Sequence, residues 1–135
     1  MGAYVAAWTD VVPDPHVMTH LFYAFGGVNE TFDGVYINRP ERLRMIAGLK
    51  AQNPDLKILL SVGGWKSGRF SEMAAAQALR EAFAKDCRRI VDELGIDGID
   101  IDWEYPTSDV AGISASPDDT ENFTLLMMEL RRQLG

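Results

Sequence analysis

The chain has 135 residues, of which 47% are hydrophobic and 24% are charged, and its formal net charge is −7. A chain of this length forms one globular domain that buries roughly two-thirds of its unfolded surface. An acidic chain repels phosphate backbones, which excludes nucleic acid as a partner, and no apolar run is long enough to place the chain in a membrane.

Short apolar segments alternate with longer amphipathic ones along the chain. The apolar segments predict buried strands at residues 3–8, 20–28, 57–62 and 98–104. Helices are predicted from Pro40 to about Asn53, over residues 78–94 with Gly95 as C-cap, and from Asp119 or Thr120 onward. Residues 29–39 are polar and turn-rich. This order predicts an α/β fold with a parallel sheet covered by helices, either an open doubly wound sheet or a segment of a (β/α)8 barrel.

The fourth predicted strand carries the most informative residues. Residues 97–106 read Asp-Gly-Ile-Asp-Ile-Asp-Trp-Glu-Tyr-Pro. Because side chains alternate along a strand, Asp100, Asp102 and Glu104 share one face, about 6–7 Å apart, and the apolar residues share the other. Carboxyls this close cannot all ionise freely, so at least one pKa is expected to rise, as general acid catalysis requires. Glu104 comes last, at the strand end where barrel active sites lie.

Four other interpretations of the chain explain fewer of its residues. A solvated surface strand does not account for the interleaved isoleucines, and a calcium loop needs its glycine after the third ligand, whereas Gly98 precedes the acids. A hydrolase with two catalytic carboxylates usually places them on separate strands. A phosphate-binding open sheet would show glycines after its first strand, and residues 9–13 contain none.

His16 and His20 lack a second ligand at metal spacing, so we expect neither a metal nor a cofactor.

Two motifs carry a resemblance to a known family. Residues 97–104 resemble the Asp-x-x-Asp-x-Asp-x-Glu signature of the family 18 glycoside hydrolases, and Tyr105-Pro106 resembles the chitinases among them. Residues 61–65, Ser-Val-Gly-Gly-Trp, are similar to the Ser-x-Gly-Gly motif of the family, and residues 4–8 and 20–25 look like its first two strands. The resemblance implies that residues 1–135 are a partial catalytic domain, comprising the first four βα units of a TIM (β/α)8 barrel with parallel strands and outer helices.

The resemblance also implies an activity, which is hydrolysis of β-1,4-linked N-acetylglucosamine polymers by a substrate-assisted retaining mechanism. Glu104 would protonate the glycosidic oxygen, Asp102 would orient the acetamido group of the substrate, and Asp100 would tune Asp102. Tyr4 and Ser61 match positions that support the aspartates, and Phe25, Trp65 and Tyr105 match aromatic positions of the sugar cleft. We expect Trp8 and Trp103 in the core, and a structural role for Asp97 and for a buried Cys87. The alternatives are an endo-β-N-acetylglucosaminidase acting on glycans and a non-catalytic chitin-binding protein.

The chain departs from the family in extent. It supplies four of eight strands, whereas later strands of the family carry further side chains that hold the sugar. We therefore expect an incomplete site with weak or no hydrolysis by this chain alone, and open edges at the first and fourth strands that favour self-association. Family members are commonly secreted, although no signal peptide is recognised after Met1.

Overall fold

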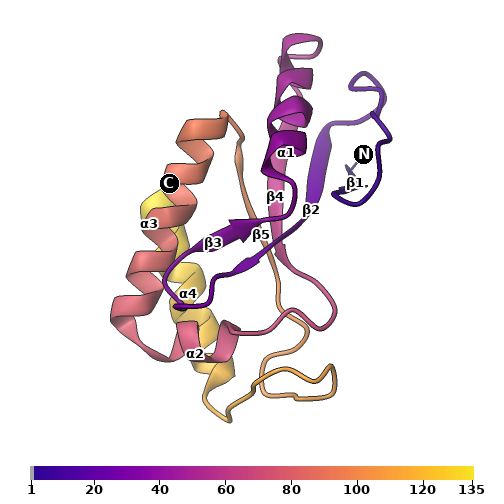
Figure 1. Ribbon diagram of the computed structural model, residues 1–135. Coiled ribbons are helices and arrows are strands. Elements are labelled where there is room, and N and C mark those ends of the chain that lie inside the picture. The colour runs from indigo at the N-terminus through magenta and orange to yellow at the C-terminus, as the bar shows by residue number, and fades with distance from the viewer. Residues whose placement is uncertain (1) are drawn as a thin grey trace.

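A parallel sheet with helices along one flank forms the molecule (Figure 1), as the computed structural model describes it for residues 2–135. Its strands are β1 (Gly2–Ala6), β2 (His20–Val28), β4 (Lys57–Gly63) and β5 (Gly98–Asp102), and they lie side by side in the order β1-β2-β4-β5. All three pairings between them are parallel, which confirms the predicted sheet. One short strand was not predicted: β3 (Val35–Ile37) pairs antiparallel with the end of β2, inside the segment expected to hold turns only.

Helices follow β3, β4 and β5, whereas residues 7–19 between β1 and β2 contain no helix. The helices are α1 (Pro40–Ala47), continued by the 3-10 turn η1 (Gly48–Ala51), then α2 (Phe70–Ala75), α3 (Gln77–Leu94) and α4 (Asp119–Leu134). Pro40 lies in the first turn of α1, and Gly95 ends α3 with φ 67°, a left-handed conformation that glycine adopts without strain. The helix α2 was not predicted, because six residues are too few to show a helical period.

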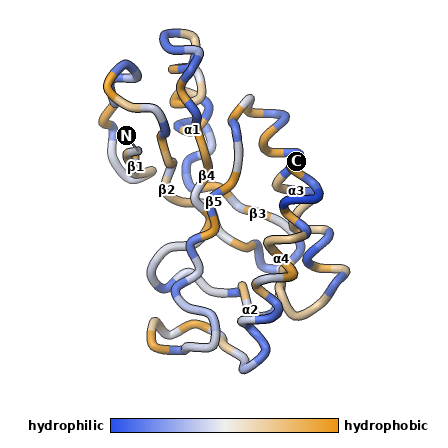
Figure 2. The backbone as a smooth tube through the Cα atoms, turned by 180° about the vertical axis from the view of Figure 1, so that it is seen from behind, coloured by the Kyte–Doolittle hydropathy of each residue, from blue (hydrophilic) through white to orange (hydrophobic). Residues whose placement is uncertain are grey.

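The two faces of the sheet differ in character. One face packs against the helices and buries the alternating side chains of β2 and β4, among them Leu21, Tyr23, Ile58, Leu60 and Val62. Figure 2 shows these hydrophobic segments at the centre of the molecule, with hydrophilic stretches toward the helices and loop tips. The opposite face carries Tyr4, Ser61, Asp100 and Asp102, and Ser61 lies directly opposite Asp100. The predicted acidic residues of β5 therefore lie on the face without helices.

Two predicted strands end earlier than the pattern suggested. β1 stops at Ala6, because Thr9 donates from both its backbone N–H and its Oγ1 to the Ala6 carbonyl and closes a turn. β5 stops at Asp102, which pairs with Gly63, the last residue of β4. β4 turns away after Gly63, so Trp103 and Glu104 have no neighbouring strand to pair with. Glu104 thus lies just past the strand end and not within the strand.

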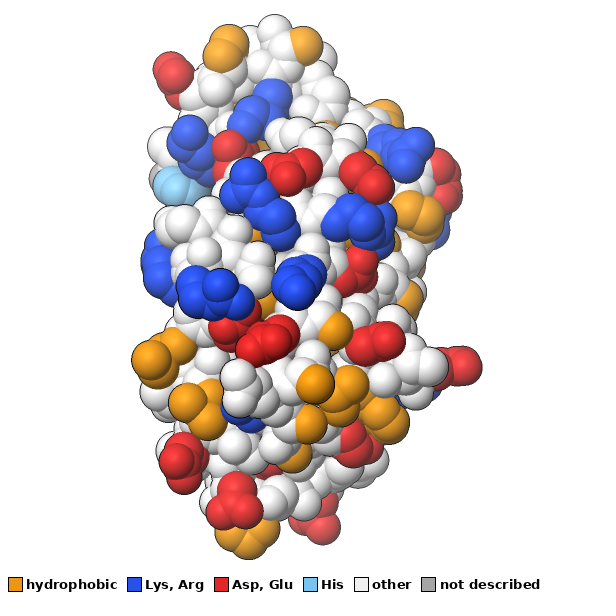
Figure 3. Space-filling model, turned by 90° about the vertical axis from the view of Figure 1, so that its left-hand side faces the viewer, with side chains coloured by type: hydrophobic (Ala, Val, Ile, Leu, Met, Phe, Trp, Pro, Cys, Tyr) orange, Lys and Arg blue, Asp and Glu red, His pale blue; other side chains and the backbone are white. Residues whose placement is uncertain are grey.

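The outer face of the helices is charged. Figure 3 shows lysine and arginine side chains interleaved with acidic ones over this side of the molecule. On α3 they form the pairs Arg88–Asp92, Arg89–Asp86 and Arg89–Glu93, at 2.7–3.0 Å, each worth about 0.3–0.5 kcal/mol when exposed. Among residues 2–135, no helix has the length and apolar character needed to cross a membrane.

Candidate active site

The three acids meet at the carboxyl end of the sheet. Asp100 and Asp102 come from β5, and Glu104 follows in the loop that leads to Tyr105. All three side chains are half-buried, so they are partly shielded from water and still open to a ligand. Asp100 and Glu104 lie near enough to Asp102 for both to act on its carboxyl.

Burial and neighbouring charge act together on the pKa of Asp102. Burial raises the pKa of Asp102, the negative charges of Glu104 and Asp100 raise it further, and the hydrogen bond with Glu104 acts in the same direction. The expectation that crowding raises at least one carboxyl pKa is therefore met at Asp102.

A hydroxyl from the neighbouring strand fixes the innermost acid. Ser61 lies opposite Asp100 in the β4–β5 register, and its Oγ donates to Asp100 Oδ2 at 2.8 Å. Ser61 itself is fully buried, so its rotamer is held by packing. Tyr4 joins this group from β1: burial raises the pKa of its phenol, as do the nearby charges of Asp100 and Asp102. The structure thus brings both predicted support residues to the aspartates.

The glycine pair after Ser61 allows β4 to approach β5. A Cβ built on Gly63, which has φ +129°, would lie 2.1 Å from the Asp102 carbonyl oxygen. A Cβ on Gly64 would lie 2.9 Å from the ring of Phe25. The Gly64 N–H donates to the Asp102 carbonyl at 2.8 Å, so the glycines bind the backbone of the acidic strand directly. This close approach is the physical reason for two glycines at this point.

Two aromatic pairs border the acids. Trp65 follows the glycine pair and lies edge-on to Tyr105, with ring centroids 6.3 Å apart, and both rings are about half exposed. Phe25, at the end of the parallel part of β2, stacks on Trp8 at 6.2 Å. The peptide bonds Ala24–Phe25 and Glu104–Tyr105 are cis. All three aromatic residues predicted for the cleft therefore lie at this edge of the sheet.

The prediction that Trp8 belongs to the core is wrong, because its side chain is 70% exposed. Two arginines of the α1 region hold the turn that carries it. Arg39 donates to the Ala7 carbonyl at 3.1 Å, and Arg42 donates to the Ala6 carbonyl at the same distance. The pattern contained a usable signal, since Trp8 lies four residues after Tyr4 and would share its face in a continued strand.

The remaining residues of the acidic strand are structural, as predicted. Trp103 is buried and stacks on Phe70 at 5.4 Å. Asp97 accepts from Lys50 Nζ at 2.6 Å and from the Ile58 N–H at 2.9 Å. Burial acts to raise the pKa of Asp97, but these hydrogen bonds lower it overall.

Cys87 has the buried, structural position predicted for it. It is fully buried in α3, and burial raises the pKa of its thiol strongly.

The last helix was predicted to begin at Asp119 or Thr120, and Asp119 has a further structural role there. The structure places the N-cap of α4 at Asp118, and Asp119 is fully buried. Its carboxylate accepts from Ser71 Oγ at 2.7 Å, from the Ser116 N–H at 2.9 Å and from the Thr107 N–H at 3.0 Å. Asp119 therefore anchors the loop that begins directly after Tyr105, which sequence reasoning did not detect.

The acid edge contains oxygen ligands but no cluster typical of a metal site. Within the described part of the chain, no three histidine, cysteine, aspartate or glutamate side chains converge as metal ligands.

Comparison with known proteins relates this geometry to a family. The model for "Glycosyl hydrolases family 18" matches residues 1–135. Chitinase A1 of Niallia circulans is 38% identical over 130 residues, which cover 93% of this chain and 17% of the relative. The chitinase domain of the spore coat protein CotE from Clostridium difficile superposes with a TM-score of 0.94 at 34% identity, over 99% of this chain and 38% of that one.

A second solved structure is named for a different activity. It is a family 18 N-acetylglucosaminidase from Paenibacillus barengoltzii, with a TM-score of 0.90 and 44% identity over 98% of this chain and 40% of that one. The chain thus spans well under half the length of each of these three proteins.

Proposed function

Because the chain belongs to the glycosyl hydrolases of family 18, with the first four βα units of their barrel, we propose that it carries the catalytic acids for hydrolysis of β-1,4-linked N-acetylglucosamine polymers. The observation that supports this most directly is the arrangement of Asp100, Asp102 and Glu104 at one strand end, with Ser61 Oγ bonded to the innermost acid. Chitin or a chitooligosaccharide is the proposed substrate.

In the proposed mechanism, Glu104 is the general acid. It donates its proton to the glycosidic oxygen as the bond from that oxygen to the anomeric carbon breaks. The carbonyl oxygen of the substrate's own acetamido group attacks the anomeric carbon and forms an oxazolinium ion. Water then attacks the same carbon, Glu104 takes the proton from that water, and the configuration at the carbon is retained.

The inner acids position the acetamido group. Asp102 accepts the acetamido N–H and stabilises the positive charge that develops on the oxazolinium ring. A proton shared between Asp100 and Asp102 keeps the pair from repelling itself, consistent with the raised pKa of Asp102. Ser61 and Tyr4 act as positioning residues, because the Ser61 hydroxyl donates to Asp100 and the Tyr4 phenol lies near both aspartates.

The aromatic rings supply the sugar contacts. Trp65 and Tyr105 offer half-exposed rings on one side of the acids, and Trp8 stacked on Phe25 offers an exposed face on the other. Flat apolar faces suit the axial C–H groups of pyranose rings. We propose secretion as well, because two of the three named proteins are chitinases and a polymeric substrate must be met outside the cell.

The catalytic glutamate favours an enzyme over a sugar-binding protein, since binding alone needs no proton donor beside the scissile bond. An endo-β-N-acetylglucosaminidase acting on glycans remains the second candidate, because it would use the same acids. Turnover by this chain alone is expected to be weak: β5 is an edge strand, so the acids are open to water on one side.

The test is a comparison of two oligosaccharides that differ only in N-acetylation. Oligomers of N-acetylglucosamine should be cleaved with retention of the anomeric configuration, as observed by proton NMR of the fresh product. Oligomers of glucosamine should not be cleaved, because they lack the attacking carbonyl. Equal cleavage of both, or an inverted product, would refute the substrate-assisted mechanism.

A further inference from the structure

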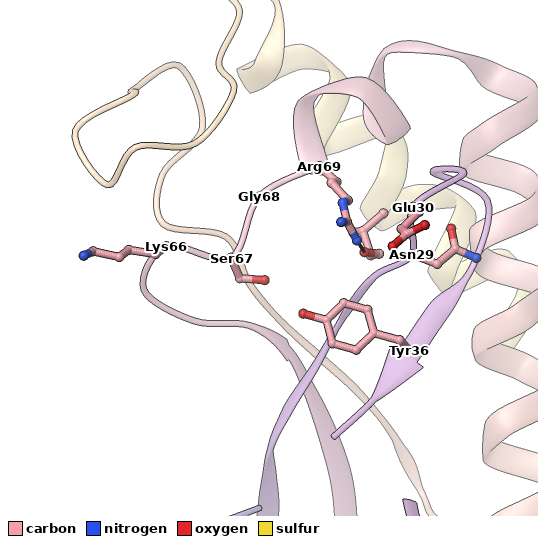
Figure 4. Close-up of a pocket in the computed structure, with 8 residues that line it drawn as sticks. Asn29, Glu30, Tyr36, Lys66, Ser67, Gly68 and Arg69 are labelled. Atoms are coloured by element: carbon pink, nitrogen blue, oxygen red, sulfur yellow. Dashed lines mark hydrogen bonds between the residues drawn. The ribbon is translucent and has the colours of Figure 1, made fainter. Parts of the chain in front are cut away.

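A cavity lies at the carboxyl edge of the sheet, apart from the acids. It has a volume of about 610 Å³, within the usual range for small-ligand sites. The loop after β2 and the loop after β4 enclose it, and none of the three acids lines it. The loop after β4 links it to the candidate active site, since Trp65 faces Tyr105 and the next four residues, 66–69, line the cavity (Figure 4).

Tyr36 forms a flat floor in this cavity. It pairs with Gly27 across the β2–β3 ladder, and a Cβ on Gly27 would lie 2.4 Å from the Tyr36 ring. The ring therefore rests on the glycine backbone, in space that any other residue would occupy. Its remaining surface is open, with the side chain 43% exposed. A ring held flat on one face and open on the other can stack on a sugar ring.

Polar groups surround this floor with nearly balanced charge. Figure 4 shows the Tyr36 hydroxyl directed toward Ser67, and the Lys66 ammonium extending away from the cavity. Arg69 Nη1 donates to the Val28 carbonyl at 3.1 Å, which fixes the guanidinium at the rim near the Glu30 side chain. One fixed cation beside one carboxylate gives little net attraction for phosphate and suits a neutral ligand rich in hydroxyls.

We propose that this cavity binds one pyranose unit of an oligosaccharide, stacked on Tyr36 and hydrogen-bonded by Ser67 and Arg69, as a second sugar position outside the acid edge. The identity of the sugar, N-acetylglucosamine, rests on the proposed function. The position itself rests on the glycine-backed ring, the polar rim and the volume. Such a position would strengthen the binding of long oligosaccharides without contacting the bond that is cleaved.

The experiment follows backbone amide signals by NMR in Glu104→Gln, which keeps the substrate intact. Titration with the hexamer of N-acetylglucosamine should shift the amides of Tyr36, Ser67 and Gly68 as well as that of Tyr105. Adding Tyr36→Ala should weaken hexamer affinity roughly two- to tenfold and leave the dimer affinity measured at Tyr105 unchanged. Tyr36→Phe should keep most of the affinity. Met45→Ala, another exposed large side chain, should change nothing.

The outcomes separate the two proposals. Shifts at Tyr105 without shifts at Ser67 and Gly68 would overturn the second position and leave the proposed function standing. Shifts at the cavity without a shift at Tyr105 would support the position and count against sugar binding at the acids. The unchanged amide of Gly27 in Tyr36→Phe serves as the check on folding, and hexamer affinity equal in Tyr36→Ala and its parent would overturn the position.

Discussion

The hydroxyl of Ser61 donates to Asp100 Oδ2 at 2.8 Å, across the one sheet pairing that joins the glycine motif to the acidic motif. Two segments nearly forty residues apart in sequence thus form a single unit. The fully buried Ser61 is held by the core, so its hydroxyl fixes the aspartate rather than following it.

Removing this hydroxyl should impair catalysis more than folding. A hydrogen bond to a charged group contributes about 1.5–3 kcal/mol, so Ser61→Ala should lower kcat roughly ten- to a hundredfold. KM should change little, because Ser61 does not contact the substrate. Steady-state kinetics on a chitooligosaccharide measures both. A fall in kcat no larger than that of Ser114→Ala, an exposed serine remote from the acids, would contradict the positioning role.

The raised pKa of Asp102 predicts how stability depends on pH. The folded state holds this proton more tightly than the unfolded chain, whose aspartate has the ordinary pKa near 3.8. The stability that this gives is fully present below the ordinary value and is lost as pH rises through the raised value. Asp102→Asn has no proton to lose at this position. The melting temperature of the variant minus that of the parent should therefore increase from pH 4 to pH 7.

Thermal unfolding followed by circular dichroism across that range is the measurement. Asp109→Asn, a carboxyl in the loop after Pro106 with an exposed side chain, is the matched control. A difference between Asp102→Asn and the parent that stays constant with pH would show that Asp102 is not the group responsible.

The glycine pair can be tested with substitutions that separate strain from collision. Gly63→Ala meets both a positive φ and the Asp102 carbonyl oxygen, so it should cost more than the about 1–3 kcal/mol of backbone strain alone. Gly95→Ala has φ +67° with no atom within 4 Å, so it should cost the strain only. Gly48→Ala has an ordinary helical φ of −64° and open space, so it should be neutral or stabilise by about 0.4–1 kcal/mol. Urea unfolding gives the three values, and any other order would contradict the close-approach argument.

Asp119 should prove necessary for the order of the loop after Tyr105. Asp119→Ala leaves Ser71 Oγ and two backbone N–H groups without their acceptor, at a cost of about 2–4 kcal/mol. Asp118→Ala, the exposed neighbour, should cost less than about 0.5 kcal/mol. Hydrogen exchange at Thr107 reports the loop directly. Protection at Thr107 that survives in Asp119→Ala would refute the anchor.

The open strands predict association of the chain in solution. β1 and β5 each pair with one neighbour only, and their outer edges present unpaired backbone groups. Sedimentation equilibrium at micromolar concentration should therefore show dimers or larger species whose fraction grows with concentration. A single monomeric species over that range would contradict this prediction.

Much of the fold was predictable, because apolar runs and helical periods extend over whole elements. The parallel sheet and the helices α1, α3 and α4 were predicted correctly, and the family match agrees with the barrel segment. Features set by a few tertiary contacts were not visible. The strand ends at Ala6 and Asp102 depend on turns, the short β3 depends on pairing with β2, and the exposure of Trp8 depends on Arg39 and Arg42.

The candidate site was likewise predictable only in part. Alternation alone placed the acids on one face, and the motif pointed to Ser61, Tyr4 and the aromatic residues. The reason for the glycines became clear only from the distance between Gly63 and Asp102. Asp119 and Tyr36 carried no local pattern, since their partners lie on other elements of the fold.

The most direct test of the account is the release of the fluorophore from a fluorogenic N,N′-diacetylchitobioside by this chain and by Glu104→Gln, with binding measured in parallel. We predict slow release by the parent, release reduced roughly 10²–10⁴-fold in the variant, and sugar binding retained in both. Release by Glu104→Gln at the parental rate, or no binding by either protein, would contradict the assignment of Glu104 as the acid of a sugar-cleaving site.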